Sequence, residues 1–354
     1  MKRAEKDATN RSSSRPTSED VAREAGFSQT TVSYVLSGSK HSNRISSETK
    51  LRILAAARRL GYSRNSIGTA LRRGYSDTLV VLAVSWELAT AHSQTIMSVS
   101  RTAAARQLST TVQIAGDDTE AMSFLNNIHS NNPFGLLLLW DSVAMPTEYL
   151  RLVREDGLPI IDLLPSGTEH VISITADRRQ GMSAATKYLI ELGHRRIGFI
   201  ARAASKWGAS REKLLGYEQA LAEAQIDFQE SLVEETRVTG FEAGHDAIRK
   251  LMNRRPDTTA VICMDDTVAI GALSAAENLG LKIPEQLSIV GHGASREGTY
   301  VKPTLTTLGV PTKMITEEAV DMLIQMRNNK DFKAATHYQP MELIVRESTG
   351  PVRS

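Results

Sequence analysis

The sequence lacks most features of secreted and membrane proteins. Its one cysteine, Cys263, lies in the apolar run 260–264, where we expect it to pack inside a strand, and a single thiol excludes a disulfide framework and a cysteine-based metal site. No stretch approaches the roughly 18 consecutive apolar residues of a membrane span. Residues 1–14 are charged and contain no apolar segment of the kind found in signal peptides. We therefore expect a disordered basic tail and a cytoplasmic protein.

Enzyme motifs are also missing. The carboxylate pairs Asp117-Asp118 and Asp265-Asp266 occur without the spacing of metal ligands, and no G-x-S-x-G nucleophile elbow is present. The run GHGASREG at 291–298 has the wrong spacing for a dinucleotide fingerprint and lies far from the first predicted strand. The sequence predicts no enzyme activity, no catalytic residue, no metal and no cofactor. An enzyme is the less favoured alternative.

Charge is unevenly distributed along the chain. The 354 residues have a net charge of +2, but residues 1–75 contain 15 Lys and Arg against 6 Asp and Glu and so carry +9. The remaining 279 residues carry −7. A basic head on an acidic body predicts that the head binds a polyanion and that the body does not.

The body alternates short apolar runs with amphipathic helical patterns. Apolar runs without polar alternation are typical of parallel sheets that helices cover on both faces. We predict an α/β fold with two doubly wound subdomains, a seam near Thr175 and a ligand crevice at the carboxyl ends of the strands. A solute-binding protein of a transport system would share this body, but the basic head and the missing signal peptide disfavour it. The predicted strands are 78–84, 110–115, 135–140, 159–164, 196–201, 231–235, 260–264 and 287–291.

The head has the pattern of a helix-turn-helix motif, two short helices joined by a turn that contains glycine. Thr17 can cap a first helix, with Asp20 three positions on as in a capping box. Gly26 ends that helix, and Ser28 can cap a second one. A third helix begins at Ser46 or Ser47 and ends at Gly61. We expect its buried residues to be Ile53, Leu54, Ala57 and Leu60.

The second helix of the head has two different faces. One face carries Val32, Val35 and Leu36, and the other carries the uncharged polar residues Gln29, Thr30, Ser33 and Tyr34. These polar side chains suit the major groove of DNA, because Gln can form two hydrogen bonds with adenine and Ser and Thr can bond to any base edge. The spacing leaves an ordinary solvated face open as the alternative.

These motifs resemble a known family. The run PTSEDVAREAG…GTALRRG at 16–74 resembles the DNA-binding head and hinge of the LacI/GalR family of bacterial repressors. The similarity covers about residues 15–349 and continues through GHRRIGFI (193–200), IPEQLSIVG (283–291), KPTLTTL (302–308) and LIVRES (343–348).

The resemblance implies an overall organisation and function. It implies a homodimeric repressor that binds a near-palindromic operator in double-stranded DNA under the control of a small-molecule effector, a sugar or related metabolite. The sequence ends without a heptad repeat, so we expect no tetramer. The implied parts are a helix-turn-helix head at 15–62, a hinge helix and linker at 63–76, and a core at 77–350 that resembles periplasmic binding proteins, with an N-subdomain at about 77–174 and 306–333 and a C-subdomain at about 175–304 and 335–349.

The resemblance also implies which residues touch DNA. The implied base readers are Gln29, Thr30 and Tyr34, the implied phosphate contacts are mainly Ser28, Thr31 and Ser33, and further implied contacts are Thr17, Asn43 and Tyr62. Many family members have Arg at the position of Tyr34. The operator sequence therefore does not follow from the family.

The hinge at 64–73 is implied to become helical on DNA and to insert Leu71 into the minor groove as a wedge. The alternative for Leu71 is an ordinary buried leucine. A proline common in the family is Arg64 here, and Gly68 costs about 0.5–1 kcal/mol of helix stability relative to Ala. We therefore expect this hinge to order less readily. The other matching positions are Asn65, near the DNA backbone, and Ala70, at the close helix pair.

The resemblance implies an effector site in the core, with departures from the family. The matching positions are Thr90, His92, Ser93, Lys213, Asp265 and Gly293. Lys213 occupies the position of a sugar-binding arginine, Asp265 that of an asparagine, and Gly293-Ala294 that of an acidic pair. These replacements weaken the prediction that the effector is a simple sugar. Trp207 can stack on an apolar ring face, or can simply pack within its loop. His92 and His292 can donate to an anion, or can form a polar rim.

Overall fold

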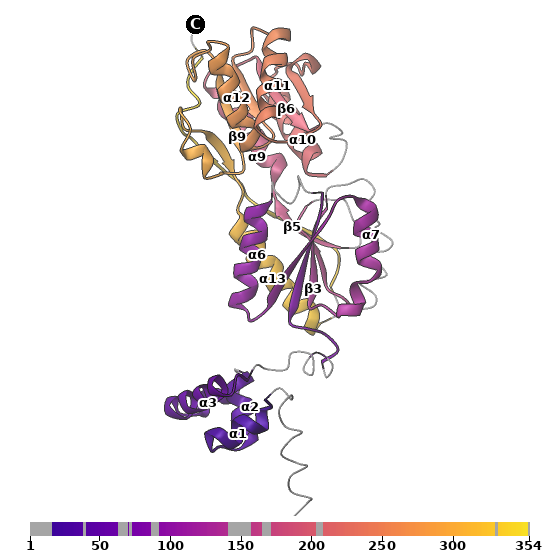
Figure 1. Cartoon of the computed structure of the whole chain (residues 1–354). Helices are drawn as coiled ribbons and strands as arrows, with labels where there is room; N and C mark the ends of the chain where they lie inside the picture. Colours follow the sequence, from indigo (N-terminus) through magenta and orange to yellow (C-terminus); the bar gives the residue numbers. More distant parts are fainter. Residues whose placement is uncertain are drawn as a thin grey trace, which may run out of the picture. The chain divides into compact units, whose positions relative to one another are not determined.

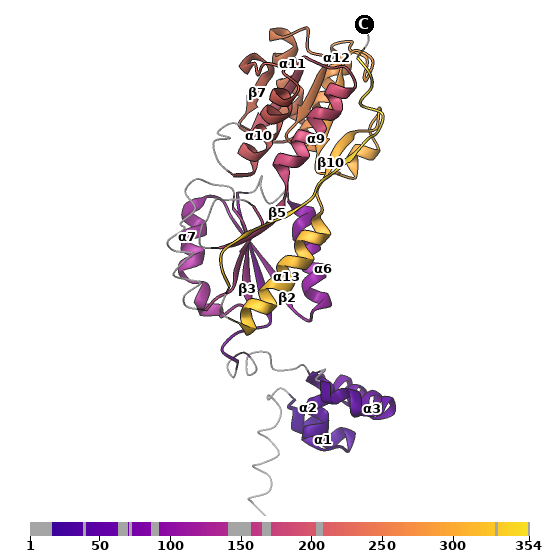
Figure 2. The same cartoon turned by 180° about the vertical axis from the view of Figure 1, so that it is seen from behind.

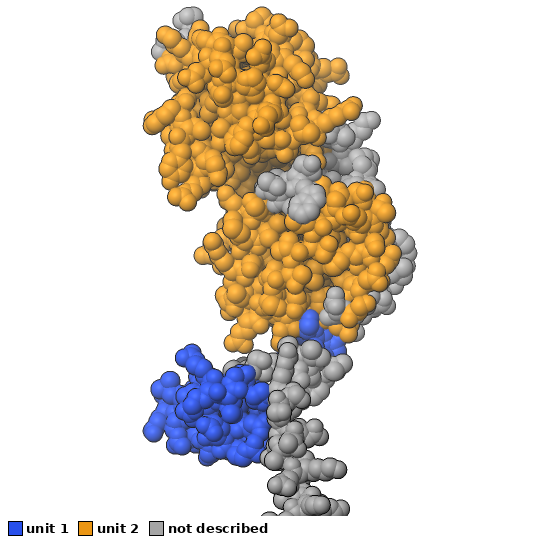
Figure 3. Space-filling model, in the orientation of Figure 1, with its two compact units in different colours: residues 1–76 blue, residues 77–354 orange. Residues whose placement is uncertain are grey.

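The computed structural model describes residues 16–37, 40–62, 70, 73–85, 92–140, 157–164, 171–202, 208–329 and 332–352. The chain forms two compact units, residues 1–76 and residues 77–354 (Figure 3). Each unit has a hydrophobic core of its own.

The first unit is a small helical head. Its elements are α1 (Ser18–Ala25), α2 (Gln29–Ser37), the 3₁₀ turn η1 (Lys40–Arg44) and α3 (Ser47–Arg59). The predicted capping box at the start of α1 is confirmed, because the Asp20 amide donates to the Thr17 hydroxyl and the Thr17 amide donates to the Asp20 carboxylate. Gly26 ends α1 with φ +75°, a left-handed conformation that glycine adopts without strain.

One predicted core residue of the head is wrong. Leu54 is 50% exposed, and Ala56 is buried instead, together with Ile53 and Ala57. Residues 53, 56, 57 and 60 lie on one face of α3, whereas residue 54 is turned about 100° away from residue 53. The predicted ends of α3 are confirmed, since Ser46 caps it and Gly61 follows with φ +64°.

The first sheet of the body has the strand order β11-β5-β4-β3-β1-β2 and is parallel throughout. Helices α6 (Ser93–Ala105) and α13 (Thr312–Asn328) lie on one face, and α7 (Asp118–Asn126), followed by η2 (Ile128–Asn131), lies on the other (Figures 1 and 2). The strands are β1 (Thr78–Val84), β2 (Ser109–Ala115), β3 (Gly135–Leu139), β4 (Ile160–Asp162), β5 (Ile172–Ala176) and β11 (Thr336–Gln339).

The second sheet has the order β12-β10-β9-β8-β6-β7, in which only the edge strand β12 is antiparallel. The strands are β6 (Ile197–Arg202), β7 (Val233–Thr236), β8 (Ala260–Cys263), β9 (Ser288–His292), β10 (Thr306–Gly309) and β12 (Glu342–Ile344). The helices are α9 (Arg178–Glu191), α10 (Gly208–Glu223), α11 (Phe241–Arg254) and α12 (Asp266–Asn278), with short 3₁₀ turns η3 (Glu230–Leu232) and η4 (Glu297–Thr299).

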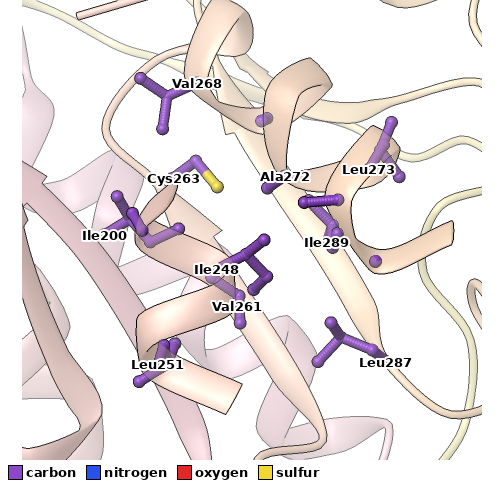
Figure 4. Close-up of a cluster of buried hydrophobic side chains, with 14 of the residues drawn as sticks. Ile200, Ile248, Leu251, Val261, Cys263, Val268, Ala272, Leu273, Leu287 and Ile289 are labelled. Carbon is purple, nitrogen blue, oxygen red and sulfur yellow. The ribbon is translucent and has the colours of Figure 1, made fainter. Parts of the chain in front are cut away.

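Helices cover both faces of the second sheet, as the apolar runs predict. Side chains alternate along β8, so that Val261 and Cys263 pack against α11 and α12, whereas Ala260 and Ile262 pack against α9 and α10. Figure 4 shows Cys263 among the aliphatic side chains of the first cluster. Burial raises the pKa of its thiol well above the usual value. The predicted packing role of Cys263 is confirmed.

The last two crossings of the chain between the sheets lie later in the sequence than the predicted subdomain division places them. The prediction puts 306–333 in the first subdomain, where α13 does pack, but β10 pairs with β9 in the second sheet. It puts 335–349 in the second subdomain, where β12 does pair with β10, but β11 pairs with β5 in the first sheet. Thr175, the predicted seam, lies within β5. These strands have four or five residues and mixed polarity, so no apolar run marks them.

Membrane and metal features are absent from the described residues. Within the ranges given above, no helix is long and apolar enough to cross a membrane. In the same ranges, no group of three or more His, Cys, Asp or Glu is placed to hold a metal ion.

A reciprocal pair of glycines allows α11 and α12 to pack closely. A Cβ atom at Gly244 would lie 1.9 Å from the Val268 carbonyl oxygen, and one at Gly271 would lie 1.9 Å from the Phe241 carbonyl oxygen. Both neighbours are backbone atoms, which cannot turn aside. Any side chain at either position would push the two helices apart.

We predict that Gly244→Ala lowers the free energy of unfolding by about 1–3 kcal/mol, the usual cost of overpacking a core. Gly116→Ala is the control, because its new Cβ would meet only side-chain atoms of Glu120, the nearest at 3.3 Å, and no backbone atom. Thermal melting should show a lower Tm for Gly244→Ala alone. Equal Tm values for the two variants would contradict the close packing.

We expect a buried histidine, His194, to make the stability of the body depend on pH. The ring nitrogens of His194 lie 3.0 Å from the Thr259 hydroxyl and 3.0 Å from the Gly350 carbonyl oxygen, and burial holds the pKa below its usual value. The unfolded chain therefore takes up a proton first as the pH falls. The contribution of His194 to stability is fully present above its unfolded pKa of about 6.5. It is lost as the pH falls from there through the lower pKa of the folded state.

We predict that Tm falls between pH 7.5 and pH 5.5 and that His194→Gln reduces this fall. The partly exposed His245, on α11, gives the control variant His245→Gln, which should keep the wild-type dependence. Tm measured at both pH values tests this. An unchanged fall in His194→Gln would show that His194 is not responsible.

Candidate nucleic-acid interface and effector site

The polar face of α2 is open to solvent. Gln29, Thr30, Ser33 and Tyr34 are exposed, whereas Val32 is fully buried beneath them. This division follows from the helical spacing, because the apolar positions form one stripe that packs on α1 and α3. The helix therefore presents hydrogen-bonding side chains without a formal charge.

Two predicted phosphate contacts take part in the start of α2. The Thr31 amide donates to the Ser28 hydroxyl at 3.2 Å, and the two hydroxyls lie 2.8 Å apart. Thr17 is engaged in the same way at the start of α1. These contacts fix the helix starts, and each hydroxyl oxygen keeps a second lone pair for another partner.

An aromatic pair lies beside the polar face. The Tyr34 and His41 rings have centroids 5.0 Å apart and an interplanar angle of 32°. His41 comes from η1, so this turn contacts the Tyr34 ring of α2. Asn43 is exposed on the same turn, and Tyr62 packs half-buried against the core of the head.

Part of the positive charge of the head is engaged within the head. Arg23 pairs with Asp20, Arg59 lies 3.2 Å from Glu24, and Arg52 lies over the Phe27 ring at 4.9 Å from its centroid. The Thr17 hydrogen bonds and the Arg23 charge hold the pKa of Asp20 below its usual value. Charge in the head therefore also positions its helices.

Of the three predicted hinge residues, Ala70 is among the described residues. Ala70 has helical backbone and its carbonyl oxygen accepts from the Gly74 amide at 2.8 Å. Asn65 and Leu71 lie outside the described residues. Their predicted roles remain predictions.

In the body, the carboxyl ends of β8 and β9 gather the predicted effector residues. Ile262 of β8 is level with Val290 of β9, which places Met264 beside His292. The Lys213 ammonium, on α10, donates to the Met264 carbonyl oxygen at 2.6 Å. Carboxyl ends of parallel strands are the usual ligand-binding edge of such sheets.

His292 is the buried centre of this region. Its side chain is 7% exposed, and no hydrogen-bond partner for Nε2 occurs among the described residues. Burial, then the charges of Lys213 and Arg178, hold its pKa well below the usual value, and His92 acts in the same direction. The ring is therefore neutral at pH 7.

The two adjacent aspartates are occupied by the fold. Asp265 caps α12, accepting from the Val268 amide at 2.8 Å. Asp266 is buried and accepts from the Thr307 hydroxyl and from the Ser295 amide, each at 2.5 Å. Burial raises the Asp266 pKa, although both hydrogen bonds oppose that rise. Asp266 thereby holds the turn that follows β9, in which Gly293 adopts φ +135°.

The other two carboxylates of the enzyme alternative also have structural contacts. Asp117 caps α7 by accepting from the Glu120 amide at 2.9 Å, and Asp118 accepts from the Trp140 indole at 2.8 Å.

The structure brings together most of the described effector candidates. His92 directly precedes α6 and acts electrostatically on His292, and Lys213 does the same from α10. Ser93 is exposed at the first position of α6. Thr90 and Trp207 lie outside the described residues.

Sequence reasoning missed three residues of these sites. The His41 ring contacts Tyr34, Arg178 is buried near His292, and Asp266 anchors the turn after β9. The position of His41 shortly after the second helix is only a weak sequence signal for its contact with Tyr34. Nothing in the sequence pattern marks Arg178 as buried.

Comparisons with known proteins agree with the fold in both units. Residues 17–65 match the family model of bacterial regulatory proteins of the lacI family, and residues 186–349 match that of a periplasmic binding protein-like domain. The chain is similar to the HTH-type transcriptional repressor PurR of Klebsiella pneumoniae subsp. pneumoniae, with 30% identity over 321 residues that cover 89% of this chain and 91% of the relative.

Solved structures are similar over nearly the whole chain. A complex of the transcriptional regulator CelR with cellobiose has 27% identity and a TM-score of 0.70, covering 94% of this chain and all of that one. The lac repressor dimer bound to operator and the anti-inducer ONPF shares the fold, with a TM-score of 0.76, 24% identity and coverage of 95% and 100%. The chain belongs to the LacI/GalR family of bacterial transcription regulators.

Proposed function

We propose that this chain represses transcription by binding a near-palindromic operator as a homodimer, and that a small-molecule effector bound in the body controls that binding. The observation that carries the proposal is the polar, uncharged and exposed face of α2 in a basic head. A regulatory function is favoured over an enzymatic one, because the relatives reported above are regulators. A DNA partner places this function in the cytoplasm.

The reading face supports direct recognition of base edges. Gln29 lies at the start of α2, the part of a recognition helix that contacts bases in helix-turn-helix proteins. Its amide can bond to both exposed edge groups of adenine. Tyr34, in contact with the His41 ring, offers an aromatic surface to a thymine methyl group. The operator should therefore include A·T pairs in each half-site.

Two heads are needed for a specific complex. One short helix supplies few base contacts, and a two-fold symmetric dimer doubles them on a near-palindromic site. A hinge that becomes helical only on DNA would join the two heads, with Leu71 as the wedge and Asn65 and Ala70 beside it. An effector that changes the spacing of two subunits would then prevent or promote this helix.

The effector is proposed to bind at the carboxyl ends of the strands of the body. The solved CelR complex contains cellobiose, which supports a carbohydrate or related metabolite here. His92, Lys213, Asp265, His292 and Gly293 support this position, with Thr90, Ser93 and Trp207 as further candidates.

We predict that Gln29→Ala weakens binding to the selected operator by about 1–3 kcal/mol and relaxes the base preference at one position in each half-site. The expected change in Kd is about 5- to 150-fold. Fluorescence anisotropy with the operator and with single-base variants of it measures both effects.

Two further variants serve as controls. Lys50→Ala, on α3, should weaken binding evenly across sequences and lower its salt dependence, because a lost cation affects phosphate contacts and not base contacts. Gln219→Ala, exposed on α10 of the body, should have no effect. An unchanged base preference in Gln29→Ala would remove α2 from its proposed reading role.

We also predict that the protein is a dimer in solution or becomes one on the operator. Light scattering of the free protein and of its DNA complex determines the mass. A monomer in both states would contradict the two-fold symmetric mechanism.

A further inference from the structure

The turn η1 follows the reading helix α2 and exposes three side chains that can donate hydrogen bonds. These are His41, Asn43 and Arg44, and the turn contains no acidic residue. The family resemblance implies a DNA contact for Asn43 alone. The proposed function uses neither Arg44 nor the ring nitrogens of His41, so most of this basic surface has no assigned role.

We infer that η1 is a second DNA-contacting element of the head, in which Arg44 and His41 donate hydrogen bonds to phosphate oxygens at the rim of the major groove. This inference rests on the proposed function, because it adds a backbone contact with the same DNA partner. Phosphate contacts hold a protein in register on the duplex without reading its sequence. The turn would thus position α2, whose own side chains read the bases.

The first argument is the position of η1 beyond the end of α2. The helix has nine residues and is about 13 Å long, whereas the major groove is about 8.5 Å deep. With Gln29 and the first turn of α2 at the base edges, the last turn lies near the rim of the groove, where the phosphates are. η1 begins at Lys40, three residues beyond the last residue of α2.

The second argument is the contact between η1 and the polar face of α2. The centroid of the His41 ring lies 5.0 Å from that of Tyr34, a residue of this face that is 37% exposed. η1 therefore lies beside the reading residues and not on the side of α2 that packs against α1 and α3. DNA that meets the polar face of α2 also meets η1.

The third argument is that the charge of Arg44 is available to a partner. Arg44 is exposed, and its guanidinium takes part in no ion pair or hydrogen bond within the part of the chain that the structure describes. Arg23 and Arg59 of the same head are instead paired with carboxylates of α1. A guanidinium presents a planar fork of donors that matches a phosphate group.

The turn is also anchored by its own buried residues. Ser42 is 9% exposed, and its carbonyl oxygen accepts from the Ile45 amide at 3.0 Å. Ile45 packs against the core of the head, and Ser46 caps α3 directly afterwards. Donors on an anchored turn lose less conformational freedom on binding than donors on a loose one, which favours the contact.

The experiment measures Kd of the full-length protein for an operator duplex and for a duplex of random sequence at several salt concentrations. Arg44→Gln should weaken both complexes by about tenfold, because a phosphate contact does not depend on the bases. The slope of log Kd against log salt concentration should fall by about 2, since a dimer loses two contacts of about 0.9 each. Arg44→Lys keeps the charge and should keep most of the slope.

Two further variants complete the series. His41→Phe keeps an aromatic ring beside Tyr34 but removes the ring nitrogens, so it should weaken both complexes and leave the base preference unchanged. Arg249→Gln, the control, removes an exposed arginine of α11 in the body and should change neither Kd nor the slope. Tm values without DNA verify that each variant is folded.

Methylphosphonate linkages, which remove the charge of one phosphate at a time, locate the contact on the operator. Wild type should lose affinity when a phosphate at the rim of each half-site is replaced, and Arg44→Gln should be insensitive there. Identical profiles for the two proteins, an unchanged salt slope in Arg44→Gln, or equally low slopes in Arg44→Lys and Arg44→Gln would overturn the inference. Tighter DNA binding by Arg44→Gln would overturn it as well and would indicate an acidic protein partner.

The random duplex separates this inference from the proposed function. A protein that shows no operator preference, but whose salt slope on the random duplex falls in Arg44→Gln, would support the contact by η1 and contradict the proposed function. A protein in which Gln29→Ala relaxes the base preference, while Arg44→Gln changes neither Kd nor the slope, would support the proposed function and overturn the inference.

Discussion

Parallel strands must be covered by helices on both faces, and this constraint decides where the body can place a binding site. The chain has to return through a helix after almost every strand, so all parallel strands end at the same edge. That edge is where Met264, His292 and the Asp265-Asp266 pair occur in the second sheet. The close approach of α11 and α12 at Gly244 and Gly271 belongs to the same covering layer. The interior of the sheets is apolar, and the chemistry is left to the strand ends.

The head differs from the body because it is too small to bury much surface. Its three helices share one core of small and branched residues, and their ends are fixed by Thr17, Ser28 and Ser46. Each cap satisfies backbone amides that the helix cannot pair itself. With the helix ends fixed in this way, the outer face of α2 is not needed for packing and can present polar groups to DNA.

Local rules predicted much of this structure. The capping box, the glycine stop at Gly26 and the two faces of α2 follow from neighbouring residues, and apolar runs predicted eight strands, from β1 to β9 apart from β5. The prediction placed Leu54 in the core, but on α3 the inward-facing position belongs to Ala56, and Leu54 is exposed. The polar strands β10 and β11 lack an apolar run, so the sequence did not show on which side of each crossing between the sheets they lie. The contact of His41 with Tyr34 and the burial of Arg178 depend on tertiary packing, which a sequence pattern does not show.

The central claim is that the head reads a DNA sequence as one half of a symmetric pair. Selection of double-stranded DNA from a random library by the full-length protein, followed by sequencing, tests it most directly. The account predicts one enriched motif with two inverted half-sites whose separation corresponds to adjacent major grooves on one side of the duplex. A bound pool with no enriched motif, or with a single half-site and no inverted partner, would contradict it.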